Sequence, residues 1–305
     1  MVQPARESEI ARKYLEPKVV SQLERLDLKA RLVVEGFITG LHRSPYQGFS
    51  VEFAEHRQYM PGDPIRHIDW KVYGKTDRFY VRRFEEETNL KAYLLLDTSR
   101  SMQFASPGQI PKLEYAKYLA ASFSYLMMMQ QDSVGVLLFS DRVGKYLPPR
   151  STKTHLKTIL RELEWTKASN TTNIAECLHL LAERIKRRGL IILISDLLDR
   201  PERVLAALKH FRHRKHEVIV FHILDPYELS FSYPEEAEFV DMETGRGITT
   251  HPLEIARGYQ ARLKEWTNVY TRTCRENLID YHVIDTSTPF DRALIGYLKK
   301  RKSLY

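Results

Sequence analysis

The sequence predicts an α/β fold, in which a mostly parallel sheet carries helices on both faces, with a small β-rich module near the N-terminus. Two observations predict the sheet. Apolar runs of strand length alternate with amphipathic stretches of helix length from residue 91 onward, which is typical of a parallel sheet between two helical layers. The apolar runs are nearly continuous, as expected of strands that are buried on both sides.

The expected strands cover residues 92–96, 134–139, 143–147, 190–195, 218–224 and 281–284. Asp141 and Arg142 form a tight turn between the second and third of these strands. Such a short connection predicts an antiparallel hairpin, which we place at the edge of the sheet. Residues 225–250, between the last two strands, are expected to contain a further short strand or hairpin, with Gly245 and Gly247 at its turn.

Helices are expected between the strands, because apolar residues recur there at every third or fourth position. Pro201 stands where the first residue of one helix should lie, a position that proline favours. The expected helices cover residues 112–130, 154–164, 174–186, 201–212, 252–277 and 290–300. Cys177 and Cys274 fall within two of them, far apart and outside any CxxC pattern, so we expect two buried free thiols.

Three segments organise the chain: an N-terminal helical segment over 1–30, a β-rich module over 31–90, and the α/β domain over 91–305. Glycines and short alternating runs distinguish the middle segment, although its boundary within 27–43 is poorly defined. That module also carries closely spaced charges of both signs. They predict an ion-pair network that locks the module to the α/β domain, or alternatively a face that binds a partner.

Composition and charge narrow the functional classes. Of the 305 residues, 43% are hydrophobic and 28% are charged, which is typical of a globular protein and excludes wholesale disorder. The net charge of +8 permits nucleic acid, anionic lipid or an acidic protein as a partner. The N-terminus lacks the apolar core of a signal peptide, and no apolar run approaches the roughly 20 residues of a membrane helix. We therefore expect a cytoplasmic protein without a membrane span.

Carboxylates and hydroxyls follow the predicted strands. Asp97 ends the first strand and is followed by Ser99 and Ser101, while Asp196 ends the strand at 190–195. In open α/β sheets, ligands bind beyond the carboxyl ends of the strands. An all-oxygen set without cysteine or histidine suits a hard cation, so the pattern predicts Mg²⁺ or Mn²⁺. Because hydroxyls are neutral, the bound metal would attract an outside carboxylate.

The pattern Asp97-x-Ser99-x-Ser101 resembles the first motif of the metal-ion-dependent adhesion site (MIDAS) of von Willebrand factor A domains. Thr172 is similar to the threonine of the family's second loop, with Thr171 as the alternative, and Asp196 matches its third loop. The resemblance implies that the two serines and the threonine ligate the metal, directly or through water. It implies that the aspartates anchor the site and that a partner's Asp or Glu completes the coordination.

A second resemblance covers most of the chain, from about Gly36 to the C-terminus. It is carried by Gly48–Asp63, Ile65–Trp70, Thr76-Asp77-Arg78 and Val81–Glu85, followed by the α/β pattern. These residues resemble the bacterial domain-of-unknown-function family 58, whose members join such a block to a von Willebrand A-like domain. The resemblance implies an adaptor that works with a MoxR-type AAA+ ATPase in chaperone-like complex assembly or maturation. The chain has no GxxxxGK[ST] motif of its own.

Two alternative functions are less well supported by the sequence. A metal-dependent phosphohydrolase would need a second carboxylate two residues after Asp97, where Ser99 stands, so we expect no enzyme activity. Nucleic-acid binding would use the basic stretches 186–188, 209–216 and 299–302. They lie at or just after the ends of predicted helices and lack interleaved aromatic residues, so we interpret them as solvated surface.

Overall fold

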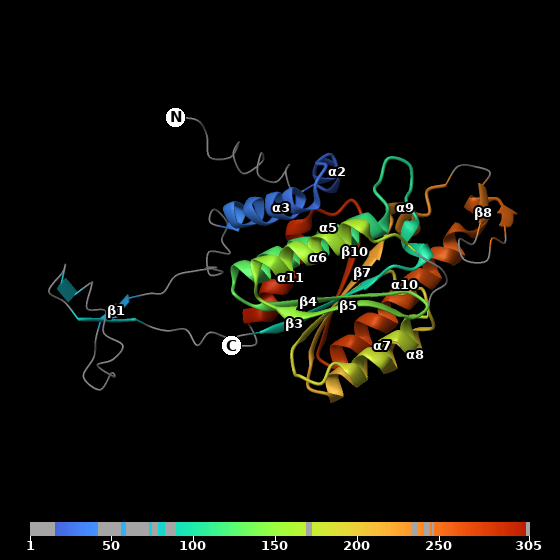
Figure 1. Cartoon of the computed structure of the whole chain (residues 1–305). Coiled ribbons are helices and arrows are strands. Elements are labelled where there is room, and N and C mark those ends of the chain that lie inside the picture. Colours follow the sequence, from blue (N-terminus) through green and yellow to red (C-terminus); the bar gives the residue numbers. More distant parts are fainter. Residues whose placement is uncertain are drawn as a thin grey trace.

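The computed structural model describes residues 16–41, 56–58, 73–74, 79–82, 90–168, 173–233, 237–240, 245 and 247–302. Its centre is a six-stranded sheet in the order β10-β7-β6-β3-β4-β5 (Figure 1). The strands are β3 (Lys91–Asp97), β4 (Ser133–Phe139), β5 (Val143–Arg150), β6 (Leu190–Ser195), β7 (Glu217–Leu224) and β10 (Ile279–Asp285). The sheet confirms the predicted α/β class.

The topology is that of a doubly wound sheet. Five strands run parallel, whereas β5 pairs with β4 in the antiparallel direction and forms one edge, as the short turn predicted. If the six strands are counted in chain order, they are arranged 3-2-1-4-5-6 across the sheet. The direction of winding therefore reverses between β3 and β6, and in such sheets this is where a ligand-binding crevice forms.

Helices cover both faces of the sheet (Figure 1). Their bounds are α2 (Pro17–Ser21), α3 (Leu26–Leu41), η2 (Arg100–Gln103), α5 (Lys112–Met129), α6 (Lys153–Trp165), α7 (Ile174–Arg184), α8 (Pro201–His213), α9 (Pro226–Ser230), α10 (Pro252–Glu276) and α11 (Phe290–Lys302). Leu94 and Leu96 pack in one core with α3, α5, α6 and α11, whereas Tyr93 and Leu95 pack in a second core with α7, α8 and α10. Side chains alternate between the faces of a strand, so β3 joins both cores.

The helix α3 corrects the boundary that we expected at residue 30. It continues to Leu41, so residues 31–41 are helical rather than part of a β-rich module. From the sequence, Gly36 and Gly40 are expected to lie among short β-like runs of that module. However, Ala30, Val33 and Phe37 are buried at helical spacing in the core that α3 shares with α5. Burial of this apolar stripe outweighs the weak helix propensity of glycine.

Only part of the predicted β-rich module is described. Its two strands, β1 (His56–Gln58) and β2 (Tyr80–Arg82), pair in the antiparallel direction. Most of the charged residues for which we predicted an ion-pair network lie outside the described residues. A second small hairpin, β8 (Ala237–Val240) and β9 (Gly247–Thr250), lies between α9 and α10, where Gly245 adopts the left-handed conformation. None of the helices in the described part of the chain is long and apolar enough to cross a membrane.

Two buried imidazoles predict how stability depends on pH. The Nε2 atom of His155 lies 3.0 Å from the carbonyl of Val134, and that of His216 lies 3.2 Å from the carbonyl of Ile185. Burial lowers the pKa of both rings below the ordinary 6.5. The unfolded chain therefore binds protons first, and the free energy of unfolding should decrease as pH falls below about 6.5.

Urea unfolding at about pH 7.5 and about pH 5.5 measures this dependence. His216→Gln should weaken it, whereas the same change at exposed His213 should leave it intact. An equal decrease in stability in all three proteins would contradict the contribution assigned to His216.

Candidate functional site

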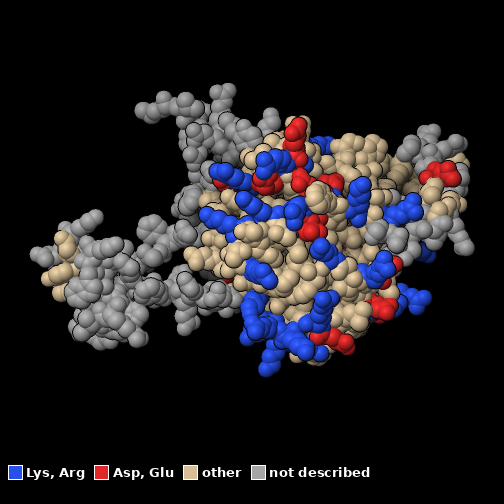
Figure 2. All heavy atoms as spheres, viewed as in Figure 1, with Lys and Arg blue, Asp and Glu red and all other residues tan. Residues whose placement is uncertain are grey.

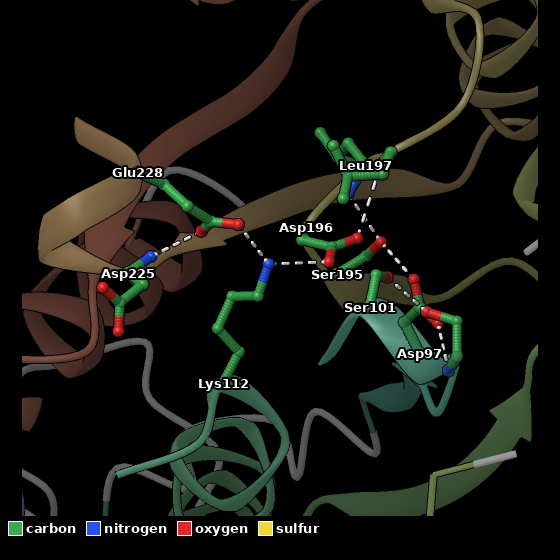
Figure 3. Close-up of polar contacts among 10 residues, drawn as sticks. Asp97, Ser101, Lys112, Ser195, Asp196, Leu197, Asp225 and Glu228 are labelled. Atoms are coloured by element: carbon green, nitrogen blue, oxygen red, sulfur yellow. Dashed lines mark hydrogen bonds and ion pairs between the residues drawn. The ribbon is translucent and has the colours of Figure 1, made fainter. Parts of the chain in front are cut away.

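The two predicted aspartates meet at the carboxyl ends of β3 and β6, where the winding of the sheet reverses (Figure 3). Both are fully buried. Because these strands are neighbours, the hydroxyl of Ser195 reaches Asp97 and donates to its Oδ2 atom over 2.6 Å. The same hydroxyl accepts from the backbone N–H of Leu197 at 2.9 Å. Ser195 therefore joins the loops after the two strands.

Ser99 and Ser101 lie directly beside Asp97. The backbone N–H of Ser99 donates to Asp97 Oδ1 at 2.9 Å, which turns the chain sharply after β3. The one-turn helix η2 begins at the next residue and holds Ser101 near Ser99. Their hydroxyl oxygens lie 3.0 Å apart, and both side chains are buried. Four of the five predicted site residues, Asp97, Ser99, Ser101 and Asp196, thus lie at one edge of the sheet.

The fifth predicted residue, Thr172, and its alternative Thr171 lie outside the described residues. The next described residue is Asn173, whose backbone N–H donates to the carbonyl of Ser140 at 3.2 Å. Since Ser140 directly follows β4, the start of α7 lies at the same edge of the sheet as Asp97.

Burial and, to a smaller extent, the negative charge of Asp196 raise the pKa of Asp97 to about 7. The hydrogen bonds from Ser195 and Ser99 act in the opposite direction but are outweighed. Two acidic groups are thus held near each other in a water-poor environment. A cation beside Asp97 would relieve this repulsion.

A buried lysine that we did not predict lies on the other side of Asp196. Lys112, the first residue of α5, places its ammonium 2.9 Å from Asp196 Oδ2 and 2.8 Å from Glu228 Oε1 (Figure 3). Its side chain is fully buried. Burial alone would lower the pKa of Lys112, but the two facing carboxylates together outweigh burial and raise it. Lys112 is therefore a permanently charged part of the site.

The loop after β7 completes the arrangement. Asp225 directly follows β7, caps α9 by accepting from Tyr227 N–H at 2.8 Å, and accepts from Ser106 N–H at 2.9 Å. Glu228 accepts from the backbone N–H of Asp225 at 2.7 Å, which orients its other oxygen toward Lys112. Asp225 could have been found from the sequence, because it follows an apolar strand just as Asp97 and Asp196 do. Lys112 gave no such signal, since it opens a helix remote in sequence from both partners.

The residues present fit a hard divalent cation. Adjacent oxygen ligands of Mg²⁺ at 2.0–2.1 Å lie about 2.9 Å apart in an octahedron, and the Ser99 and Ser101 hydroxyls are 3.0 Å apart. Two carboxylates, those of Asp196 and Glu228, contact the single ammonium of Lys112, and Asp97 lies beyond Asp196 as a third acidic group. Within the described ranges, no group of three or more His, Cys, Asp or Glu side chains is arranged to hold a metal. A cation at this position would therefore need hydroxyl oxygens among its ligands.

The doubly wound sheet with one antiparallel edge strand has the architecture of a von Willebrand A-like domain, the fold class that the sequence predicts. Residues 55–266 match the family described as protein of unknown function DUF58, and the chain belongs to this family. Uncharacterized proteins of Mycobacterium tuberculosis and Mycobacterium bovis are 28% identical over 238 residues. These matches cover 75% of this chain and 73% of each relative.

Solved structures show a similar fold at low sequence identity. The conserved hypothetical protein BatB from Bacteroides thetaiotaomicron is 19% identical with a TM-score of 0.48, over 71% of this chain and all of that one. An aerotolerance-related membrane protein from Bacteroides fragilis is 21% identical with a TM-score of 0.45, over 69% of this chain and 99% of that one. The von Willebrand A domain of SpRpn10 is 10% identical with a TM-score of 0.38, over 68% and 93% of the two chains.

The expectation of a cytoplasmic protein is corrected by these comparisons. The Bacteroides fragilis structure is described as that of a membrane protein, and a further similar structure from Vibrio fischeri is described as a membrane spanning protein. We had inferred the location from the lack of a long apolar run. That inference was wrong, since the lack of a long apolar run does not establish a cytoplasmic location.

Proposed function

We propose that the chain is a non-enzymatic adaptor that holds Mg²⁺ or Mn²⁺ at the ends of β3 and β6 and uses it to bind an acidic side chain of a protein partner. The proposed ligands and anchors are Asp97, Ser99, Ser101, Thr172 and Asp196. The observation that supports the proposal most is the pair of hydroxyls 3.0 Å apart beside two buried carboxylates. When bound, the metal supplies a positive charge with a position open to a carboxylate.

The described groups around Asp97 favour binding over catalysis, because they supply no general acid for a reaction at its carboxylate. A phosphohydrolase that used Asp97 as a nucleophile would need an acid two residues later, but Ser99 is a neutral hydroxyl bonded to Ser101. The ammonium of Lys112 is held between two carboxylates and buried, so it does not face a substrate. In the part of the chain that the structure describes, these groups position one another and leave no free acid–base pair beside Asp97.

The family resemblance makes a MoxR-type AAA+ ATPase the first partner to test. The adaptor would then act in chaperone-like assembly or maturation, and the ATPase would supply the energy. A partner's Asp or Glu would be attracted to the metal. The excess of basic residues on the chain, 47 Lys and Arg against 39 Asp and Glu, also favours an acidic partner.

The metal site is tested by replacing Ser99 with alanine. Losing one hydroxyl ligand should weaken binding of Mn²⁺ or Mg²⁺ by at least about tenfold, by analogy with the 10–100-fold cost of removing a supporting group from a metal site. Isothermal titration calorimetry measures the affinity. Ser124→Ala is the matched control, because Ser124 is equally buried but bonds to a helix carbonyl in α5. Equal affinity in the wild type and Ser99→Ala would contradict the assignment.

The adaptor function needs its own experiment. Tagged protein is used to capture partners from a native lysate, once with Mg²⁺ and once with EDTA. An AAA+ ATPase that is lost with EDTA and with Ser99→Ala, but kept with Ser124→Ala, would support the metal-dependent adaptor. An ATPase retained under all conditions would move the contact away from the metal site, and recovery of nucleic acid alone would contradict the adaptor function.

A further inference from the structure

A group of exposed cations lies at the edge of the sheet opposite the metal site. The loop from α7 to β6 carries Lys186, Arg187 and Arg188, and the loop from α8 to β7 carries Arg214 and Lys215. All five side chains are exposed. Both loops precede their strands, whereas Asp97 and Asp196 end theirs. We call these five residues the basic edge; Figure 2 shows Lys and Arg gathered at the lower end of the molecule, near the ends of α7 and α8.

The strand register places these loops side by side. Leu190 of β6 is opposite Glu217 of β7, and Val218 of β7 is opposite Ile279 of β10. The residues just before the three strands therefore lie in one row across the sheet, with neighbouring strands about 4.8 Å apart. This row brings the cations of the basic edge next to Leu278, the last residue before β10.

Acidic side chains neutralise only part of this charge. Glu217 pairs with Arg212 at 2.7 Å and lies 3.9 Å from Arg188. Glu276 is exposed near the end of α10. Among the described residues, no ion pair is recorded for Lys186, Arg187 or Lys215. The basic edge therefore keeps a net positive charge.

An apolar side chain projects from the same row. Leu278 is 69% exposed, although it is a leucine between a helix and a buried strand. Its backbone adopts the left-handed conformation, with φ of 56°, which is uncommon for leucine. At the far side of the same edge, Met129 at the end of α5 is 40% exposed. Exposed apolar side chains beside cations are what a protein uses to bind at a lipid surface.

We propose that the basic edge, with Leu278, binds peripherally to an anionic lipid surface. The cations would contact the headgroups and Leu278 would enter the boundary with the acyl chains. Nucleic acid is less well matched, because a phosphate backbone attracts cations but offers nothing to an exposed leucine. Since the metal site is at the other edge of the sheet, a lipid-bound domain would present it to partners away from the membrane. The proposal does not depend on the metal site.

Vesicle co-sedimentation of the full chain tests the proposal. The wild type should bind vesicles in which about a third of the lipid is phosphatidylglycerol, and should not bind pure phosphatidylcholine. The triple variant Lys186→Ala, Arg187→Ala and Lys215→Ala should bind about a hundredfold more weakly, at roughly fivefold per lost cation. Leu278→Asn should weaken binding by about tenfold. Asparagine tolerates the left-handed backbone, so this variant should keep the fold.

A matched control removes three cations from elsewhere: Lys167→Ala, Arg200→Ala and Arg203→Ala, all exposed in the described structure. It should bind vesicles like the wild type. A decrease equal to that of the first triple variant would show a general charge effect and overturn the proposal, as would failure of the wild type to bind anionic vesicles. Duplex DNA is measured in parallel. Tight DNA binding unaffected by Leu278→Asn, without vesicle binding, would assign the surface to nucleic acid instead.

Discussion

Replacing Lys112 with methionine is expected to lower the free energy of unfolding by about 3–5 kcal/mol. The ammonium is fully buried between Asp196 and Glu228, at 2.9 and 2.8 Å. Without it, two carboxylates remain in a water-poor environment with no opposite charge. Methionine has a similar length, so loss of charge rather than loss of volume dominates the effect. Urea unfolding in the presence of EDTA measures the change.

The neighbouring Lys117 provides the control. It lies one turn and a half further along α5 and is also buried, but its partner Glu114 at 2.7 Å is 37% exposed. Lys117→Met should therefore cost no more than about 1 kcal/mol. Adding Glu228→Gln to Lys112→Met should recover part of the loss, because one uncompensated carboxylate becomes neutral. If the two lysine substitutions destabilised the domain equally, the loss of the charge between Asp196 and Glu228 would not be the cause, and the prediction would be wrong.

Gly189→Ala is expected to destabilise the domain by about 3 kcal/mol. A Cβ atom at Gly189 would lie 2.2 Å from the backbone oxygen of Lys91 and 3.0 Å from a ring carbon of Tyr93. Gly189 directly precedes β6, whose neighbour β3 contains both residues. The clash therefore involves backbone, and relieving it would separate the two strands that carry Asp97 and Asp196. Thermal and urea unfolding measure the loss.

The matched substitution is Gly258→Ala. Gly258 is exposed in α10, and a Cβ atom there would meet nothing within 4 Å. Alanine restricts the unfolded chain and favours the helix, so this change should stabilise the domain by about 0.5–1 kcal/mol. A lower free energy of unfolding for Gly189→Ala and a higher one for Gly258→Ala would support the steric explanation. A small effect of Gly189→Ala would mean that the strands accommodate the methyl group.

The regular elements of the α/β domain were predictable because each has a periodicity of its own. The apolar runs that became β3, β6 and β7 are buried on both faces and contain few polar residues. The turn at Asp141 correctly placed β5 as an antiparallel edge. The helix α3 was missed beyond residue 30, because its glycines obscured an apolar stripe that only its packing against α5 makes decisive.

The candidate site also contains residues that the sequence predicted and residues that only the structure identified. Asp97 and Asp196 were identified because each follows a buried strand, and in a parallel sheet such positions meet at one edge. Ser195 and Lys112 were not singled out. The bond from Ser195 to Asp97 depends on the pairing of β3 with β6, whose residues are almost 100 positions apart. Lys112 reaches Glu228, more than 100 residues away in the sequence, only because α5 and α9 meet at the same edge of the sheet.

By itself, the sequence determined the class of fold, the strands whose ends carry carboxylates and the family of the chain, since these depend on patterns that are local along the chain. The tertiary structure alone decided which side chains meet. It placed a buried ammonium beside Asp196 and assembled separate loops into one basic edge with Leu278. The physical reason is that charge and burial act through space, so their partners are set by strand order and register rather than by distance in sequence.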